Sequence, residues 1–160
     1  MTLHIRNATM SDYAPLCAIL AEGDALHSEF LPNRFCHPRE YQVARTREYI
    51  FSLIDDPDTS VLLAEEESQI AGAIITIVRD TAPIPILTLR RVANIDIIVV
   101  RQDQQGRGIG QALMAQAEQW ARTMGADDIE LTVYFFNQKA IRFYSGLGYE
   151  GLSQKMVKKL

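Results

Sequence analysis

Three glycines at alternate positions, Gly106, Gly108 and Gly110, form the most distinctive feature of this sequence. They follow a mostly apolar, strand-forming run at residues 95–100 and precede the pattern of an amphipathic helix. A helix that begins directly after such a loop presents unpaired backbone N–H groups and the positive end of its dipole. Because these groups bind anions, the spacing predicts a site for a phosphate or pyrophosphate.

Two common phosphate loops do not fit the glycine spacing. The dinucleotide pattern G-x-G-x-x-G requires a third glycine where Gln111 or Leu113 stands. The P-loop requires a Gly-Lys pair, and the sequence contains none. The remaining pattern is Q-x-x-G-x-G, from Gln105 to Gly110.

A second segment, residues 137–149, carries an ordered set of helix signals. Asn137 is a favourable N-cap, and Gly148 suits the left-handed position after a helix ends. Tyr144 falls on the helix between them. The segment reads N-x-x-A-x-x-x-Y-x-x-x-G-Y.

The two segments together resemble the GCN5-related N-acetyltransferases, the GNAT family. Their patterns in that family are Q/R-x-x-G-x-G/A and N-x-x-A-x-x-x-Y-x-x-x-G-[FY], and the resemblance covers residues 95–149. Many members have a proline where this sequence has Gln102. That difference affects the turn before the loop and leaves the phosphate-binding pattern intact.

The resemblance implies a role for each matching residue. Backbone groups of the strand before the loop would pair with the pantetheine amides and the thioester oxygen of acetyl-CoA, and the loop would hold the pyrophosphate. Asn137 would contact the pantetheine arm or hold the loop, and Tyr144 would act as the general acid; plain helix packing is the alternative for Tyr144. The implied acetyl-CoA-binding residues are Ile98, Val99, Val100, Gln105, Gly106, Arg107, Gly108, Ile109, Gly110, Gln111, Asn137 and Tyr144.

The acceptor side and the general base are less clearly marked. Asp96 lies among apolar neighbours, where a carboxylate can have a raised pKa and accept a proton through water; its alternative is a solvated strand position. The resemblance places His27 in the acceptor pocket, with Phe30 and Phe35 as neighbouring substrate-binding candidates. Glu29 and Tyr134 are further pocket candidates.

Other reactive or charged residues have ordinary explanations beside functional ones. Arg107, Lys139 and Arg142 are candidate phosphate partners or solvated charges. Cys36 beside His37 suggests a thiol nucleophile only weakly, because sequence neighbours rarely form such a pair in space. No His/Cys cluster has metal-ligand spacing, so we expect no metal.

The sequence patterns predict the elements that position these residues. The N-terminal half should contain a strand at 3–5, a helix capped by Thr9 and Asp12 and ended by Gly23, and a loop or short helix at 24–37. A second helix should run from Pro38 to about Ile54, followed by a hairpin of strands at 60–64 and 70–79 and a proline-rich loop or edge strand at 82–86. Further on we expect a strand at 92–100, a helix at 108–124 capped by Gly125, a strand at 129–133, the helix after Asn137 and a final strand near Lys155. This order agrees with an α/β (α+β) fold of the GNAT type, with a mixed, mostly antiparallel sheet flanked by helices and splayed at the strand before the glycine loop.

Composition sets the broad class. The 160 residues suggest a single domain, 1–160, and 48% hydrophobic content is normal for a globular protein. The net charge of −4 does not favour nucleic-acid binding. The two cysteines form no C-x-x-C motif and imply a reducing, cytoplasmic setting. No signal peptide or membrane-spanning run is evident, and we expect no membrane partner.

We therefore predict an N-acetyltransferase that moves the acetyl group of acetyl-CoA to a primary amine of a small molecule or peptide. The amine would attack directly within a ternary complex, and the protein is a candidate homodimer. The alternatives are a ribosomal-protein-type N-terminal acetyltransferase, an inactive acyl-CoA-binding sensor and a nucleotide-phosphate binding module. Retention of Asn137 and Tyr144 speaks against the sensor.

Overall fold

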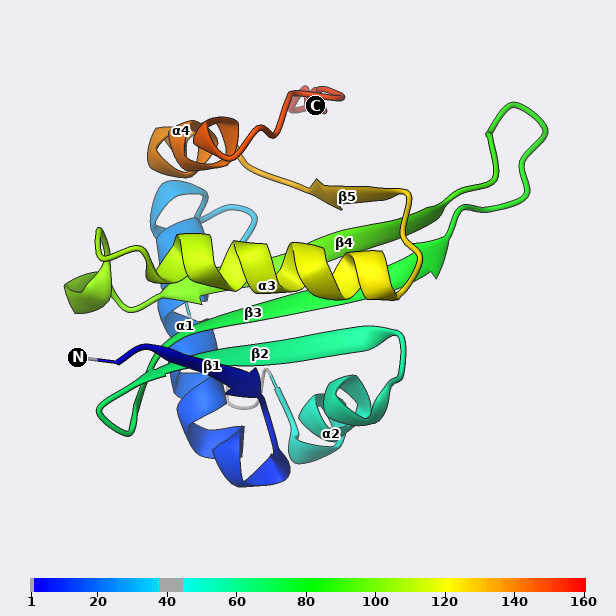
Figure 1. Ribbon diagram of the computed structural model, residues 1–160. Helices are drawn as coiled ribbons and strands as arrows, with labels where there is room; N and C mark the ends of the chain where they lie inside the picture. The colour runs from blue at the N-terminus through cyan, green and yellow to red at the C-terminus, as the bar shows by residue number, and fades with distance from the viewer. Residues whose placement is uncertain (1, 38–44) are drawn as a thin grey trace.

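A five-stranded sheet forms the centre of the protein, in a computed structural model that describes residues 2–37 and 45–160 (Figure 1). The strand order is β1-β2-β3-β4-β5, antiparallel except for the parallel pair β4–β5. The strands are β1 (His4–Asn7), β2 (Thr59–Glu66), β3 (Gln69–Asp80), β4 (Arg91–Val100) and β5 (Asp128–Leu131). This mixed, mostly antiparallel sheet confirms the predicted fold class.

Helices cover both faces of the sheet. They are α1 (Tyr13–Phe30), α2 (Arg47–Asp55), α3 (Ile109–Thr123) and α4 (Gln138–Gly146). Neighbouring residues of a strand point to opposite faces, so Ala73 joins a core with α1 and α2, whereas Ile74 joins a core with α3 and α4. Figure 1 shows α3 crossing one face with α1 behind the sheet.

The start of the first helix follows its sequence signal. Thr9 and Asp12 form the predicted capping box, with the Thr9 N–H donating to the Asp12 carboxylate at 2.8 Å. The first turn (Met10–Asp12) is a 3₁₀ turn that leads into α1. Arg6 on β1 donates to both oxygens of Asp12, at 2.8 and 2.9 Å, and to Glu65 on β2 at 2.7 Å. This arrangement ties the helix start to two strands.

The predicted end of this helix at Gly23 is wrong. α1 continues through Gly23 to Phe30. A Cβ at Gly23 would lie 3.6 Å from Val99 and 3.8 Å from Ile97, so this glycine serves a close approach of α1 to β4 and does not end the helix. The predicted loop or short helix at 24–37 is therefore helical as far as Phe30.

The second helix begins later than predicted. Arg45 and Thr46 are not helical, and α2 starts at Arg47. Thr46 is its N-cap, accepting a hydrogen bond from the Tyr49 N–H at 3.1 Å. This threonine is a stronger start signal than Pro38, which lies outside the described residues.

The β2–β3 hairpin and the strand β4 confirm the prediction for the middle of the chain. Glu67 and Ser68 turn β2 into β3 with φ values of 50° and 63°. The segment 81–90 then connects β3 to β4 without further strand, and its backbone is closed by the Thr81 N–H donating to Arg90 at 2.8 Å. Figure 1 shows this loop extending away from the rest of the molecule.

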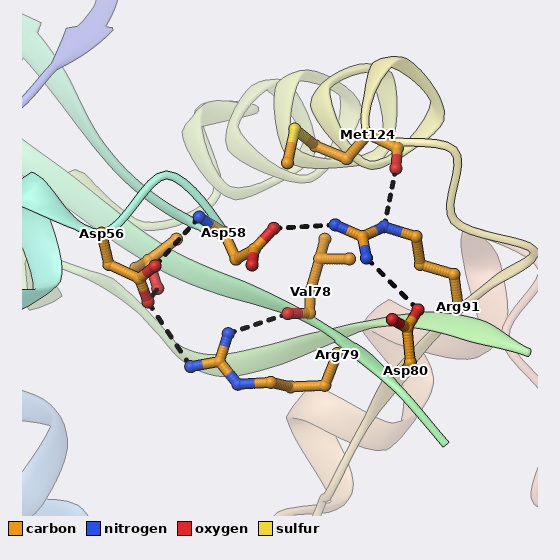
Figure 2. Close-up of polar contacts among 8 residues, drawn as sticks. Asp56, Asp58, Val78, Arg79, Asp80, Arg91 and Met124 are labelled. Carbon is orange, nitrogen blue, oxygen red and sulfur yellow. Dashed lines mark hydrogen bonds and ion pairs between the residues drawn. The ribbon is translucent and has the colours of Figure 1, made fainter. Parts of the chain in front are cut away.

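An arginine-centred network holds the sheet together at the end far from the glycine loop (Figure 2). Arg91 donates to Asp58 at 2.7 Å, to Asp80 at 3.2 Å and to the carbonyl of Met124 at 2.9 Å. These partners lie at the start of β2, the end of β3 and the end of α3. A single side chain therefore links two neighbouring strand ends and satisfies a carbonyl at a helix C-terminus.

The predicted final strand near Lys155 is wrong. Residues 150–160 are exposed and form no regular structure. Their larger apolar residues stand at positions 152, 156, 157 and 160, a helical spacing with no alternation for a strand to bury on one face.

Candidate functional site

The glycine loop leads directly into α3, as predicted. Gly106 and Gly108 have φ values of 80° and 81°, a conformation that glycine adopts without strain, and Gly108 is the N-cap. The first helical hydrogen bond runs from the Ala112 N–H to the Gly108 carbonyl at 3.0 Å. The N–H groups of the first three helical residues, 109–111, therefore lack partners within the helix and point to an anion site.

Gln105 links this loop to two other elements. Its side-chain NH₂ donates to the carbonyl of Val100, at the end of β4, at 3.1 Å. Its side-chain oxygen accepts a hydrogen bond from Lys139 of α4. The first residue of the motif thereby fixes where the loop leaves the strand and connects it to the helix that carries Tyr144.

Two glycines without positive φ let α3 pack closely. A Cβ at Gly110 would lie 3.3 Å from the Phe143 ring of α4. A Cβ at Gly72 on β3 would lie 3.0 Å from Leu113 and 3.2 Å from Ile109. The absence of side chains at these positions sets how deeply the N-terminus of α3 sits between the sheet and α4.

Arg107, a predicted phosphate partner, is engaged with protein groups. Its guanidinium pairs with the two carboxylate oxygens of Glu66 at 2.8 and 3.1 Å, and it also donates to Gln104. Of the other two predicted cations, Lys139 contacts Gln105 and Arg142 lies exposed on α4.

The strand before the loop is bulged and splayed. Ile75 pairs with Ile97 and Thr76 with Ile95, which leaves Asp96 as the extra residue of a bulge. Pairing with β5 ends at Ile95, although β4 continues to Val100. The backbone of residues 97–100 therefore has no β5 partner on that side, while the side chains of Ile98, Val99 and Val100 pack in the two cores.

Tyr144 is held in place by the C-terminal turn of α4. The Tyr149 N–H donates to its carbonyl at 3.0 Å and the Gly148 N–H donates to Ser145 at 3.1 Å, which together form a Schellman motif with Gly148 at φ 90°. At the other end of α4, the Asn137 side chain accepts the Ala140 N–H at 3.1 Å, as predicted for an N-cap. Burial raises the pKa of the Tyr144 phenol, so the group stays protonated at neutral pH.

The acceptor-side candidates His27, Phe30 and Phe35 come together with two further rings. His27 lies 5.3 Å from Phe35, 5.5 Å from Tyr134 and 5.9 Å from Phe136, measured between ring centroids. Phe30 stacks on Phe136 at 4.7 Å. We call these five rings the aromatic cluster.

Phe136 is the member of the aromatic cluster that the sequence reasoning missed. Tyr134 and Phe136 belong to the segment between β5 and α4, which brings them to the end of α1. The run Tyr-Phe-Phe directly after a strand was the available signal.

The remaining candidates lie apart from the aromatic cluster or at its margin. Asp96 is exposed, at the bulge of β4. Glu29 and His37 line a cleft on α1 together with Phe35. Cys36 is an exposed free thiol. Across residues 2–37 and 45–160, no group of acidic, His and Cys residues is arranged to hold a metal, and no helix is long and apolar enough to cross a membrane.

Comparison with protein families gives a match to the acetyltransferase (GNAT) family over residues 24–149. An uncharacterized N-acetyltransferase of Methanocaldococcus jannaschii is 46% identical over 61 residues. That alignment covers 38% of this chain and 27% of the relative, so the chain spans about a quarter of that protein's length.

Solved structures show the same fold. A crystal structure of a mutant protein from Bacillus halodurans has a TM-score of 0.91 at 24% identity and covers 98% of this chain and 99% of its own. An aminoglycoside 6'-N-acetyltransferase of Acinetobacter baumannii has a TM-score of 0.74 at 16% identity, with 99% of this chain and 98% of its own covered. At these identities the likeness concerns the fold.

Proposed function

The chain belongs to the acetyltransferase (GNAT) family, and on this premise we propose that it is an acyltransferase that transfers the acetyl group of acetyl-CoA to a primary amine. The observation that carries the proposal is the succession of splayed β4, glycine loop and α3 N-terminus, with Tyr144 held on the adjacent α4. The amine would attack directly, with both substrates bound at once.

The described residues fit the donor that we propose. The unpartnered N–H groups at the start of α3, with no atom near the would-be Cβ atoms of Gly106 and Gly108, suit a pyrophosphate approaching the backbone. The edge of β4 along Ile98, Val99 and Val100 that faces away from β3 has no β5 partner, and it suits the amide groups of a pantetheine arm. The proposed holding residues are these three, Gln105 to Gln111 and Asn137.

Acetyl-CoA supplies an activated thioester, and the protein supplies position and proton transfer. Holding two reactants together is worth roughly 7–11 kcal/mol of the barrier in favourable cases. We assign to the half-buried Tyr144 phenol the donation of a proton toward the leaving sulfur. Asp96 is our candidate for accepting, through water, the proton that the nitrogen loses after attack, because it is exposed at the bulge of the splayed strand.

Thermal stability in the presence of three ligands tests the donor site. Acetyl-CoA and CoA should raise the midpoint of unfolding, and ATP should leave it unchanged. Stabilisation by ATP alone would instead identify a nucleotide-phosphate module. The variant Gly108→Val, which forces a branched side chain into a left-handed position, should lose most of the acetyl-CoA effect.

Thiol release from acetyl-CoA across a panel of amines tests the transfer itself. The panel should contain small amines, aminoglycosides and peptides with free N-termini, since the ribosomal-protein-type N-terminal acetyltransferase is the alternative acceptor class. Release with at least one amine is expected. Binding of acetyl-CoA without release to any member would favour the acyl-CoA sensor.

We further propose that the protein acts as a cytoplasmic homodimer without nucleic-acid or membrane partners. The two free cysteines and the net charge of −4 support the setting and the absence of nucleic acid. Ile86 is 89% exposed and Leu89 70% exposed on the extended β3–β4 loop, and a second copy would cover them. Light scattering should give twice the monomer mass, and the double variant Ile86→Ser, Leu89→Ser should shift it toward the monomer.

A further inference from the structure

The tautomer of His27 follows from its position on α1. Its Nδ1 lies 3.0 Å from the carbonyl oxygen of Gly23, one turn earlier in the helix. A carbonyl oxygen only accepts hydrogen bonds, so Nδ1 carries the hydrogen. A neutral imidazole has one N–H, and the lone pair therefore resides on Nε2. Among the described residues, none forms a hydrogen bond with Nε2.

The surroundings of His27 favour a cation beside that lone pair. Phe35, Tyr134 and Phe136 all lie within 6 Å of the His27 ring, centroid to centroid. An ammonium group that lies over the face of an aromatic ring, within about 6 Å of its centroid, is attracted to it. Phe30 is 53% exposed and Tyr134 36% exposed, so the aromatic cluster is open to solvent at its margin.

The carboxylate that lies about one turn before His27 on α1 is already paired. Asp24 follows Gly23 directly and forms a two-pronged ion pair with Arg45, one arm of which measures 3.0 Å. No carboxylate among the described residues bonds to the His27 ring, so this is no His–Asp dyad. Among residues 2–37 and 45–160, Nε2 has no hydrogen-bond partner and can accept a hydrogen from a bound ligand.

The aromatic cluster stands where the two parallel strands separate. Gly23, whose carbonyl holds His27, packs against Ile97 and Val99 of the unpaired part of β4. Tyr134 and Phe136 follow β5 shortly after its pairing with β4 ends at Leu131. The cluster thus joins the two sides of the opening in which, under the proposed function, the acetyl group is presented.

We infer that the aromatic cluster receives the acceptor as an ammonium ion and that His27 Nε2 removes its first proton. This inference rests on the proposed acetyl transfer. The N–H bond of the ammonium group breaks and leaves its electron pair on nitrogen, while the lone pair of Nε2 binds the proton. The products are a neutral amine able to attack and an imidazolium that returns the proton to solvent. His27 is thereby a catalytic residue distinct from Tyr144 and Asp96.

Nitrogen-15 NMR of the histidine side chains tests the His27 tautomer and the binding of an ammonium ion without any turnover. The wild-type protein should show His27 as the Nδ1–H tautomer, and 2-phenylethylamine should move the Nε2 resonance. The neutral analogue 2-phenylethanol is the matched control and should move it much less. An Nε2–H tautomer, or equal shifts with both compounds, would overturn the inference.

Rescue by imidazole tests the proposed proton transfer to His27. His27→Ala should lose about 100-fold in turnover, the low end of what a general base contributes, with acetyl-CoA binding unchanged. Added imidazole should raise the turnover of His27→Ala about tenfold, whereas the turnover of Phe35→Leu should not increase with imidazole. If His27→Ala does not fold, His27→Gln replaces it. Full activity of the variant, or a loss that imidazole does not restore, contradicts the proton transfer.

The two measurements also separate this inference from the proposed function. Absence of thiol release by the wild-type protein with every amine contradicts the proposed transfer, and the NMR result still decides the tautomer and the preference for an ammonium ion. Normal wild-type turnover with a fully active His27→Ala variant contradicts the inference alone.

Discussion

At the scale of single residues, Tyr144 and Tyr149 form a natural comparison. Their rings lie 6.0 Å apart, and burial raises the pKa of both phenols. Tyr149 donates its hydroxyl hydrogen to Glu118 at 3.2 Å, whereas no described residue forms a hydrogen bond with the Tyr144 hydroxyl. A half-buried hydroxyl without a partner among the described residues is available to donate to a bound group, which supports a chemical role for Tyr144.

Replacing each tyrosine by phenylalanine should separate rate from stability. We expect Tyr144→Phe to lower turnover about 10- to 100-fold, at or below the low end of acid catalysis, since a thiolate is already a fair leaving group. Acetyl-CoA affinity should not change. The control Tyr149→Phe should cost about 0.5–1.5 kcal/mol of stability and leave turnover intact. Equal turnover in the two variants would remove the acid role of Tyr144.

Asp12 should govern part of the stability in acid. Hydrogen bonds from Arg6, with further ones from Thr9, hold the pKa of its carboxyl well below the usual 3.8. A lowered folded-state pKa means that the stabilisation is present above about pH 4 and is lost as the pH falls below it. Asp12→Asn should therefore cost about 1–3 kcal/mol at pH 7 and flatten the decline of stability below pH 4, as measured by urea unfolding.

The same substitution at an exposed ion pair provides the control. Asp128 pairs with Arg90, and its side chain is 47% exposed. Asp128→Asn should change the stability at pH 7 by no more than about 1 kcal/mol, because exposed pairs contribute little. A larger effect at Asp128 than at Asp12 would contradict the importance of the helix start.

At the scale of elements, the packing of α3 against β3 sets the position of the α3 N-terminus, where the predicted anion site lies. Gly72→Val should push the first turns of α3 from the sheet, because a Cβ there already lies 3.0 Å from Leu113. We expect a loss of about 1–3 kcal/mol in stability from overpacking and a weaker calorimetric affinity for acetyl-CoA. Gly146→Ala is the matched control, since its Cβ meets no atom within 4 Å, and it should bind acetyl-CoA normally.

The sequence predicted the helix ends well where a residue type matches what the backbone needs at that position, a positive φ or a capping side chain. Gly125 and Gly148 end α3 and α4 with φ values of 71° and 90°, and Asn137 and Thr9 begin helices as their side chains suggest. Gly23 is also a glycine, but it does not end a helix. It allows α1 to pack closely against β4, and nothing in the neighbouring sequence indicates this tertiary contact. The aromatic cluster was only partly predicted for the same reason, because its two groups of rings, at 27–35 and at 134–136, are more than 90 positions apart in the sequence.

At the scale of the whole molecule, the donor site and the Arg91 network occupy opposite ends of β4. Arg91 begins the strand and the glycine loop follows its last residue, Val100. Removal of the network should therefore affect folding more than acetyl-CoA binding. Arg91→Ala should lower the midpoint of thermal unfolding by several degrees, because a helix-end carbonyl and two carboxylates lose their partner, and Arg91→Lys should recover only part of this.

Acetyl-CoA affinity shows whether the effect of Arg91→Ala is confined to its own end of β4. It should be the same in Arg91→Ala and the wild-type protein at a temperature where both are folded. A large loss of affinity would show that the far end of the sheet controls the splay of β4.

Amide hydrogen exchange at the C-terminal turn of α4 reports how readily this turn opens. The Tyr149 amide hydrogen is bonded to the Tyr144 carbonyl, so this hydrogen exchanges with deuterated solvent only when the turn bearing the phenol opens. Its exchange half-life, compared with that of an unprotected amide, measures the equilibrium between the closed and the open turn. A bound acetyl-CoA that rests against this turn would lengthen that half-life, and a single amide resonance would report it without any reaction taking place.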